Sequence, residues 1–484
     1  MNLFELILKQ MRQRLLSTLL TSISILLGVT LAIAVLILGR ESRAVFAQSD
    51  YGVELVVGPK ASPLQLVMNT FYHIDVSPGN IPYGLYEDIA TAREFSDNGK
   101  RNPFRGMASW AVPIAVGDSY KGRRIIGTSP LLFGADDAGE PLPLTDENGN
   151  SRLSRIPVFR TGERYSFSEG HAFAANKLEA VIGSRVAREL GLRIGSTFRA
   201  THGVPAADLP LGEEHNLEWT VVGVLNETHT ANDNVLFIPL LTFYAIFEHE
   251  DALEKINALQ EGIASPAPNR APATAATTEV QRPDEGYTRK PDGTIEVKLP
   301  KKDWQVSAIL VHTRSAKALL DFQFILRNLP DAIGASPADV MAKFFDTFLP
   351  KISMMLIIIS TLVTVVAGVS IMVSIYNSVM ARRREIAIMR ALGATKARIL
   401  TTVCLEAGFI GTIGAVAGFL AGHLLTSIGS WYMYRTFGAS LPWWRVGGME
   451  IAYVLCVIVI SLLAGLVPAM KAYETPVAEN LVAA

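Results

Sequence analysis

The stretch Ala381–Leu400 reads ARRREIAIMRALGATKARIL and lies between two long apolar runs. It contains a single acid, Glu385, and six basic residues: Arg382, Arg383, Arg384, Arg390, Lys396 and Arg398. Lysine and arginine beside a span resist translocation, so this charge predicts a short loop on the cytoplasmic side of a membrane. Apolar residues recur up to Gly393, which predicts a helix with a hydrophobic stripe. Either this helix lies at the membrane surface and fixes the topology, or it docks a cytoplasmic partner.

The apolar runs predict four transmembrane helices, because about 20 apolar residues cross about 30 Å of hydrocarbon. We place the spans at 16–40, 351–380 (which includes a stalk), 401–428 and 450–470. A signal peptide is the alternative for the first run. That run exceeds the roughly 7–15 residues of an apolar signal core, and no clear cleavage site follows it.

The basic residues beside the spans orient the chain. Residues 1–15 form an expected amphipathic helix at the cytoplasmic surface, with Lys9, Arg12 and Arg14 holding the N-terminus inside. The later segments then alternate between the two sides of the membrane, because each span crosses it once. The segments 41–350 and 429–449 lie outside, and the segments 381–400 and 471–484 lie inside.

The composition limits what the outer region can contain. The net charge of −1 gives no indication of nucleic-acid binding, because basic residues gather beside the apolar runs and acids gather elsewhere. The two cysteines, Cys404 and Cys456, both fall within apolar runs. The polar region 41–350 therefore has neither disulfides nor cysteine-ligated zinc.

The polar region is predicted to be mixed α/β, so the fold class is membrane α plus α/β. Strand candidates include Val53–Val57, Trp219–Leu225 and Val306–His312, which are short and rich in β-branched residues. The segment 262–303 is rich in Ala, Pro and Thr and is interpreted as a flexible insertion.

The third span carries the glycines Gly411, Gly414, Gly418 and Gly422, of which the last three are four residues apart. Small residues four apart allow two helices to approach closely in lipid. The alternative is that glycine is simply common in membrane helices. Glu406 and His423, near the ends of this span, are either functional ionisable groups or residues that reach the interface.

One group of histidines and acids in the outer region suggests a divalent metal: His202, Glu214, His215 and His229. Imidazole and carboxylate together suit zinc. The spacing matches no compact ligand motif, so solvated loops between strands are the competing interpretation.

The sequence resembles the MacB/FtsX-type (type VII, mechanotransmission) permease subunits of ABC transporters. The strongest similarity runs through Arg383-Arg384-Glu385-Ile386-Ala387-Ile388-Met389-Arg390-Ala391-Leu392-Gly393-Ala394-Thr395. It continues in Glu406 and the glycines that follow, in Gly465-Leu466-Val467-Pro468-Ala469, and in the tail Pro476–Leu481. A softer similarity to the periplasmic domain lies in Val181–Ser184 and Val221–Val224.

The resemblance implies a bacterial inner-membrane permease with both termini cytoplasmic and a large periplasmic domain. It implies partners: a separate cytoplasmic ABC ATPase, a second permease copy as a homodimer, membrane lipid, and a periplasmic adaptor or substrate protein. ATP and magnesium would bind to the ATPase, and this chain would bind no cofactor apart from the candidate divalent metal. The coupling helix would be Arg383, Arg384, Glu385, Ile386, Ala387, Ile388, Met389, Arg390, Ala391, Leu392, Gly393 and Ala394.

Three functions stay open on the sequence. The first is a permease whose periplasmic domain moves to export or extract a lipoprotein, peptide or drug. The second is an FtsX-like regulator of a cell-wall hydrolase, and the third is a metal-binding or metal-sensing membrane receptor. An enzyme is not expected, since the Walker A pattern Gly-x-x-x-x-Gly-Lys-Ser/Thr occurs nowhere in the sequence.

Overall fold

A computed structural model describes most of the chain as two compact units. The described residues are 15–46, 52–74, 76–97, 99–145, 151–160, 162–203, 214–246, 287–391, 393–437 and 441–474. The membrane unit comprises Met1–Phe46, Phe344–Arg435 and Ser440–Ala484, and the sheet unit comprises Ala47–Lys343 and Thr436–Ala439. The expected surface helix at 1–15 lies almost wholly outside the described residues.

The membrane unit is built from helices. They are α2 (Leu15–Phe46), α9 (Pro337–Ala381, whose first turns belong to the sheet unit), α10 (Arg383–Ala391), α11 (Lys396–Phe437), α12 (Gly448–Ala464) and α13 (Leu466–Glu474). Four stretches are long and apolar enough to cross a membrane: Thr18–Glu41, Pro337–Ala381, Ala397–Arg435 and Gly448–Met470. This arrangement confirms four candidate membrane helices with a large mixed α/β region between the first and the second.

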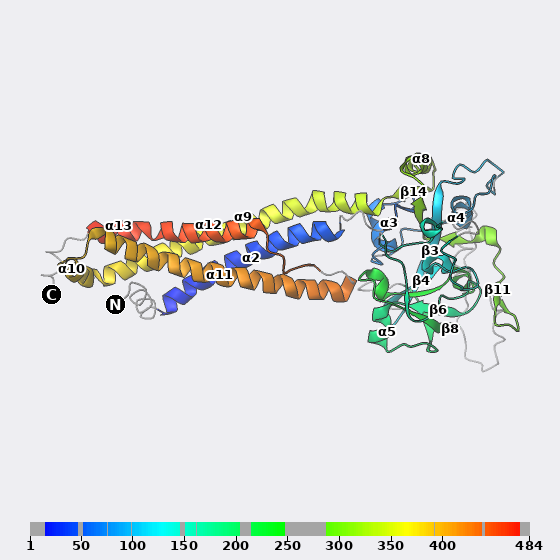
Figure 1. Cartoon of the computed structure of the whole chain (residues 1–484), viewed down its shortest axis with the longest axis horizontal. Helices are drawn as coiled ribbons and strands as arrows, with labels where there is room; N and C mark the ends of the chain where they lie inside the picture. The colour runs from blue at the N-terminus through cyan, green and yellow to red at the C-terminus, as the bar shows by residue number, and fades with distance from the viewer. Residues whose placement is uncertain are drawn as a thin grey trace, which may run out of the picture. The chain divides into compact units, whose positions relative to one another are not determined.

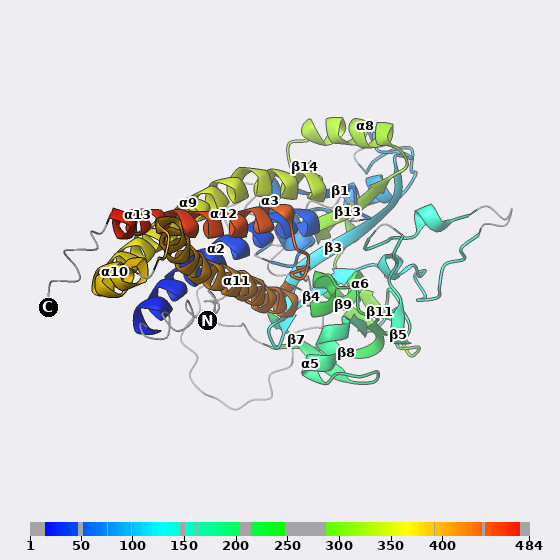
Figure 2. The same ribbon diagram turned by 60° about the vertical axis from the view of Figure 1, so that its left-hand side comes forward.

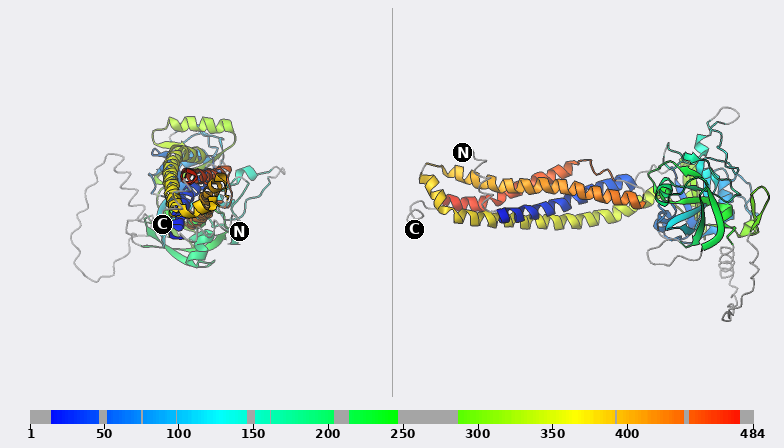
Figure 3. Two further views of the ribbon diagram at one scale, coloured as in Figure 1. Left: turned by 90° about the vertical axis from the view of Figure 1, so that its left-hand side faces the viewer. Right: turned by 90° about the horizontal axis from the view of Figure 1, so that it is seen from below.

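The long helices pack through apolar residues spaced four apart, which lie on one face of a helix. Buried residues of this kind are Ile25, Val29, Ile33 and Ile37 in α2, Ala367, Ile371, Ile375 and Val379 in α9, and Ile399, Val403 and Ala407 in α11. Figures 1 and 3 show α2, α9, α11 and α12 running side by side. Their outward faces are also apolar, as Leu362 and Leu424 illustrate, so the bundle is suited to a lipid environment.

Two helix ends differ from the predicted boundaries. The loop expected at 429–449 begins later, because α11 continues to Phe437 through residues that include no proline or glycine after Gly429. Trp431 and Tyr432 therefore lie on the last turns of a helix. The expected span 450–470 is divided at Gly465, where α12 ends and α13 begins.

The sheet unit contains fourteen strands among its described residues. They are β1 (Leu55–Pro59), β2 (Ile81–Pro82), β3 (Ala108–Tyr120), β4 (Arg123–Thr128), β5 (Phe167–Gly170), β6 (Glu179–Ile182), β7 (Thr197–His202), β8 (Glu214–Leu225), β9 (Leu236–Pro239), β10 (Tyr287–Arg289), β11 (Ile295–Val297), β12 (Gln305–Val306), β13 (Ala308–Thr313) and β14 (Ala332–Ala335). Its helices are α3 (Pro63–Thr70), α4 (Tyr83–Ala90), α5 (Ser184–Leu190), α6 (Leu240–Phe243) and α8 (Ala316–Arg327).

The main sheet has ten strands, and part of it closes on itself. Its order is β14-β1-β13-β3-β4-β9-β6-β8-β5, with β4–β9 and β6–β8 parallel. Strand β7 pairs with both β3 and β8, so β3, β4, β9, β6, β8 and β7 form a closed ring of six strands. Figure 2 shows β1, β13 and β3 beside one another, followed by β4 and β9. The seam of the ring is therefore β7.

Large apolar side chains fill the interior of this unit. Trp219 and Phe198 are buried on adjacent strands with their rings stacked, and the Trp219 indole donates a hydrogen bond to Thr242. The indole can be fully buried because its N–H has this partner.

The prediction of a flexible insertion at 262–303 is wrong for its described part, residues 287–303. Strands β10 and β11 pair as an antiparallel hairpin there. Ile295 and Leu299 are buried in the core, and this burial holds the segment in place. The Ala-, Pro- and Thr-rich residues before 287 lie outside the described residues.

Candidate functional site

Helix α10 follows directly after α9 and ends in a glycine turn. Gly393 has φ +98°, a conformation open to glycine at little cost, and its N–H donates to the carbonyl of Arg390. The Ala394 N–H donates to the carbonyl of Met389. The chain can therefore stop α10 abruptly and turn into α11.

The two faces of α10 differ sharply. Ile386 and Ala387 are 6% and 1% exposed, and Ile386 belongs to the core of the membrane unit. On other faces of the helix Ile388 and Met389 are 44% and 37% exposed, and Arg383 and Arg384 are also exposed. The helix is thus anchored to the bundle by one side and presents apolar and basic groups on the other. Leu392 lies outside the described residues.

The predicted packing glycines sit where α11 meets its neighbours. A Cβ at Gly414, Gly418 or Gly422 would lie 2.7–2.8 Å from the Cβ of Ile25, Val29 or Ile33 on α2. Such distances are closer than side-chain atoms approach. A Cβ at Gly411 would lie 2.2 Å from the Cβ of Ser461 on α12. Three of the four glycines therefore pack against one helix and the fourth against another.

A polar cluster lies within the membrane unit and joins three helices. Arg40 donates to Glu41 (Nε–Oε1 2.6 Å) and to Glu450 (Nη1–Oε1 2.7 Å). His423 contacts the other oxygen of Glu450 (Nε2–Oε2 3.1 Å). Glu41 and Glu450 are buried, and burying a carboxylate is unfavourable unless it is paired. The contacts with Arg40 and His423 offset this cost. The sequence pointed to His423 but not to Glu450, although ionisable residues inside a span are the signal for such a cluster.

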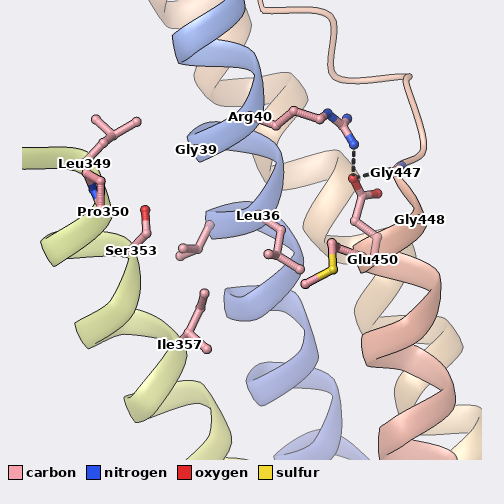
Figure 4. A pocket seen from close by; sticks show the side chains of 12 residues that line it. Leu36, Gly39, Arg40, Leu349, Pro350, Ser353, Ile357, Gly447, Gly448 and Glu450 are labelled. Carbon is pink, nitrogen blue, oxygen red and sulfur yellow. Dashed lines mark hydrogen bonds and ion pairs between the residues drawn. The ribbon is translucent and has the colours of Figure 1, made fainter. Parts of the chain in front are cut away.

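This cluster borders a cavity of about 480 Å³ between α2, α9 and the start of α12. Figure 4 shows Arg40 pointing toward Glu450, with Leu36, Leu349 and Ile357 among the lining side chains. The wall is largely apolar apart from Ser353 and the Arg40–Glu450 pair, so the cavity suits an apolar group with a polar end.

The structure brings together two of the four predicted metal ligands. His202 and His215 lie beside Asp118, with one ligand atom of each within 4.8 Å of the others. Glu214 is exposed while its neighbour His215 is buried, because alternate residues of a strand face opposite sides. His229 lies instead near Glu227 (Nδ1–Oε1 3.9 Å). Among the described residues, the structure therefore groups His202 and His215 with Asp118 and places Glu214 and His229 outside that group.

Two family models match this chain. The model for the MacB-like periplasmic core domain matches residues 18–282, more than half of the chain. The model for the FtsX-like permease C-terminal domain matches residues 357–477. The two matches cover α2 with much of the sheet unit, and then the remaining membrane helices with α10.

Curated relatives agree with these models. The uncharacterized ABC transporter permease MJ1507 of Methanocaldococcus jannaschii is 31% identical over 91 residues, 19% of this chain and 23% of the relative. The macrolide export ATP-binding/permease protein MacB of Bordetella avium is 32% identical over 143 residues, 30% of this chain and 21% of the relative. The uncharacterized ABC transporter permease YknZ of Bacillus subtilis is 33% identical over 137 residues, 26% of this chain and 32% of the relative.

The matches span only about a fifth to a third of the length of these relatives. The family models, by contrast, cover the first, third and fourth candidate spans, the second span from residue 357, and most of the polar region before residue 283. The chain therefore belongs to the MacB/FtsX-type family of ABC transporter permease subunits.

Proposed function

We propose that this permease couples ATP hydrolysis by a separate ATPase to movements of its MacB-like domain. The work done outside the membrane would be export or extraction of a lipoprotein, a peptide or a drug-like molecule. The observation that carries the proposal is the exposed face of α10, where Arg383, Arg384, Ile388 and Met389 are presented beside an anchored opposite face. A helix that only turned the chain would not need this surface.

The proposed topology places α10 in the cytoplasm of a bacterial cell, with the permease in the inner membrane. Six basic residues lie between 382 and 398, and basic residues next to a span favour the cytoplasmic side. Helices α10 and α13 lie at the same end of the bundle (Figures 1 and 3). With an even number of spans, both termini and α10 would share the cytoplasm, and the sheet unit would be periplasmic.

Helix α9 is the proposed route of the movement. Its 45 residues correspond to a length of about 68 Å, more than twice the hydrocarbon thickness. One residue, Arg382, separates α9 from α10, so a displacement of α10 would act directly on α9. Pro350 lies inside the helix and removes one backbone hydrogen bond, so it is the position where α9 would bend.

The ATPase is proposed to be a different polypeptide. The name of the Bordetella avium relative joins ATP-binding and permease functions in one protein. Residues 1–484 contain no Walker A pattern, so the nucleotide would be held elsewhere. A second copy of the permease is the proposed membrane partner, and the outward apolar side chains of α9, among them Met354, Leu362 and Val366, provide a surface that lipid or this copy can cover.

The test is purification of the tagged chain from gently solubilised membranes of its native host, followed by an ATP hydrolysis assay. The proposal expects a nucleotide-binding subunit to copurify and ATP hydrolysis to accompany it. A preparation that is intact and dimeric, yet lacks any ATPase, would argue for the receptor alternative instead.

A further inference from the structure

We propose that Asp118, His202 and His215 form a binding site for a divalent cation of the zinc type in the sheet unit. The inference goes beyond the ATP-driven transport proposed above and does not depend on it. It adds a ligand-binding property to the domain that would face the substrate. Its support is the strand geometry, the distances and the burial of these three side chains.

The three residues come from the three strands that close the ring. Asp118 on β3 is paired with His202 on β7, and β7 is paired in turn with β8, which carries His215. The Gly203 N–H donates to the carbonyl of Gly117 at 2.9 Å, which fixes the end of β7 on β3. The site therefore stands on paired strands, which hold side chains more precisely than loops do.

Register irregularities redirect these side chains. The β3–β4 pairing shifts between Val116 and Ser119, so Asp118 lies in an irregular stretch on that edge of β3, while on the other edge it pairs with His202 of β7. The β7–β8 pairing shifts between Arg199 and Thr201, just before His202. Bulges of this kind are enriched next to functional sites, because they turn a side chain in a new direction. Two of them flank one cluster here.

The distances match shared coordination better than hydrogen bonding. One carboxylate oxygen, Asp118 Oδ1, lies 3.3 Å from His215 Nε2 and 3.5 Å from His202 Nδ1. N–H···O hydrogen bonds are commonly about 2.9–3.0 Å long, so both contacts are long for that interaction. Ligands about 2.0–2.1 Å from a tetrahedral zinc ion are about 3.4 Å apart, which is the separation found.

The relative placement of the two histidine rings is compatible with both binding the same ion. The rings of His202 and His215 are nearly perpendicular, at 83°, with centroids 5.7 Å apart. All three ligand atoms lie within 4.8 Å of one another, so a modest rotation of the exposed His202 ring completes the triangle. For comparison, the contact between His423 and Glu450 in the membrane unit is shorter, at 3.1 Å.

Burial divides the three ligands into fixed and accessible groups. The side chains of Asp118 and His215 are 0% and 1% exposed, whereas the side chain of His202 is 53% exposed. A buried carboxylate needs a compensating cation or strong hydrogen bonds, and a divalent ion supplies the former. Two neutral imidazoles and one carboxylate would leave a net charge of +1 on the bound ion. A fourth position open to water or to a ligand would remain, as in exchangeable and catalytic zinc sites.

The test uses the full chain in detergent micelles, freed of metal by a chelator that is then removed. Zn²⁺ is titrated against a chromogenic competing chelator for the unmodified protein, for His202→Asn and for His229→Asn. His229 is the matched control, because it is an exposed histidine of the same unit whose ring lies near the Glu227 carboxylate, outside the Asp118 group. Asparagine also tolerates the positive φ of +54° at His229.

The proposal expects one zinc site per chain, unchanged in the control. In His202→Asn the affinity should fall at least about 10–100-fold, since loss of even an outer partner of a metal ligand has that effect. Zinc should also raise the melting temperatures of the unmodified protein and of the control. The increase for His202→Asn should be much smaller. No zinc binding, or equal affinity in all three proteins, would overturn the assignment.

A second measurement makes the test independent of how the variant folds. X-ray absorption at the zinc edge of the loaded, unmodified protein should show nitrogen or oxygen neighbours at about 2.0–2.1 Å, with the outer-shell signature of two imidazoles. A spectrum of a fully hydrated ion, or one with no imidazole, would exclude this site.

Discussion

Arg40 and Glu450 form an ion pair between α2 and α12, with Nη1 and Oε1 2.7 Å apart, although 410 positions separate them in the chain. Glu450 is 1% exposed, and its carboxylate also contacts His423 and accepts the Gly447 N–H. The same guanidinium donates to the backbone carbonyl of Arg445. One arginine thus fixes the start of α12, and the segment just before it, to the end of α2.

We expect Glu450→Gln and Arg40→Gln each to lower the free energy of unfolding by about 2 kcal/mol. The figure is below the 3–5 kcal/mol typical of a fully buried pair, because Arg40 is partly exposed and screened by solvent. Thermal melts in detergent measure it. The double variant should be less destabilised than the sum of the two, by about 0.5–3 kcal/mol. Arg445→Gln is the control, since it keeps the backbone carbonyl that accepts the Arg40 hydrogen bond. If the losses of the two single variants simply add in the double variant, the pairing of Arg40 with Glu450 is contradicted.

Gly418→Ala should destabilise the bundle by about 1–3 kcal/mol, because its Cβ would meet the Cβ of Val29 and the carbonyl of Leu26 at 2.7 and 2.8 Å. Gly429→Ala, on the same helix, is the matched control. Nothing lies within 4 Å of its added Cβ, and alanine is the better helix former by about 1 kcal/mol. The melting temperature of the first variant should fall and that of the second should hold or rise. Equal shifts would count against close α2–α11 packing.

The sheet unit should lose stability in mild acid through His73. Its Nε2 lies 2.8 Å from Asn232 Oδ1, and Asn232 donates to Tyr165. Burial lowers the pKa of His73 to about 4. The hydrogen bond to Asn232 opposes this shift, and the positive charge of Arg124 adds to it. In the unfolded chain a histidine has a pKa near 6.5. Between that pH and about 4 the unfolded state therefore binds more protons than the folded state, and the free energy of unfolding decreases as the pH is lowered.

The expected loss through His73 is about 2 kcal/mol between pH 7.5 and pH 5. Melting temperatures at the two pH values measure it, for the unmodified protein and for His73→Asn. Asparagine tolerates the φ of +55° at this position and does not titrate. The variant should be less sensitive to acid than the unmodified protein. The same acid sensitivity in both would assign the effect to other groups.

Charge reversal on the exposed face of α10 should release the ATPase without unfolding the membrane unit. Arg384→Glu is the test, and Arg398→Glu is the control, because both residues are exposed and lie in the same basic stretch. The amount of copurified ATPase should drop several-fold for the first and change little for the second. Proline at Ala387 is a poorer probe, since Ala387 is 1% exposed and the change would also break the anchored face. Equal retention of the ATPase by both variants would remove α10 as the docking site.

The sequence predicted the parts of this fold that depend on local composition. Apolar runs of sufficient length indicated the four membrane helices, and the spacing of Gly414, Gly418 and Gly422 indicated a helix contact. Which helix they contact depends on tertiary packing and was not predictable from the spacing. Strand candidates near Trp219 and Val306 lie within or beside observed strands.

Features that join distant parts of the chain were missed. Asp118 lies 97 positions before His215, and a carboxylate in a strand carries no local sign that it will face two histidines. The hairpin at 287–297 was mistaken for part of a flexible insertion, because its few apolar residues are buried only through contacts with the rest of the unit. Closure of the ring by β7 likewise depends on pairings that no single segment reveals.

The central claim is that the exposed face of α10 binds a cytoplasmic ATPase. A photo-cross-linking amino acid placed at Ile388, which is 44% exposed, tests it most directly in intact cells. The control position is Leu320 on α8 of the sheet unit, 66% exposed and proposed to face the periplasm. The account predicts a covalent adduct between position 388 and a nucleotide-binding subunit, and none from position 320. Failure of position 388 to capture that subunit, in cells where it copurifies with the permease, would contradict the claim.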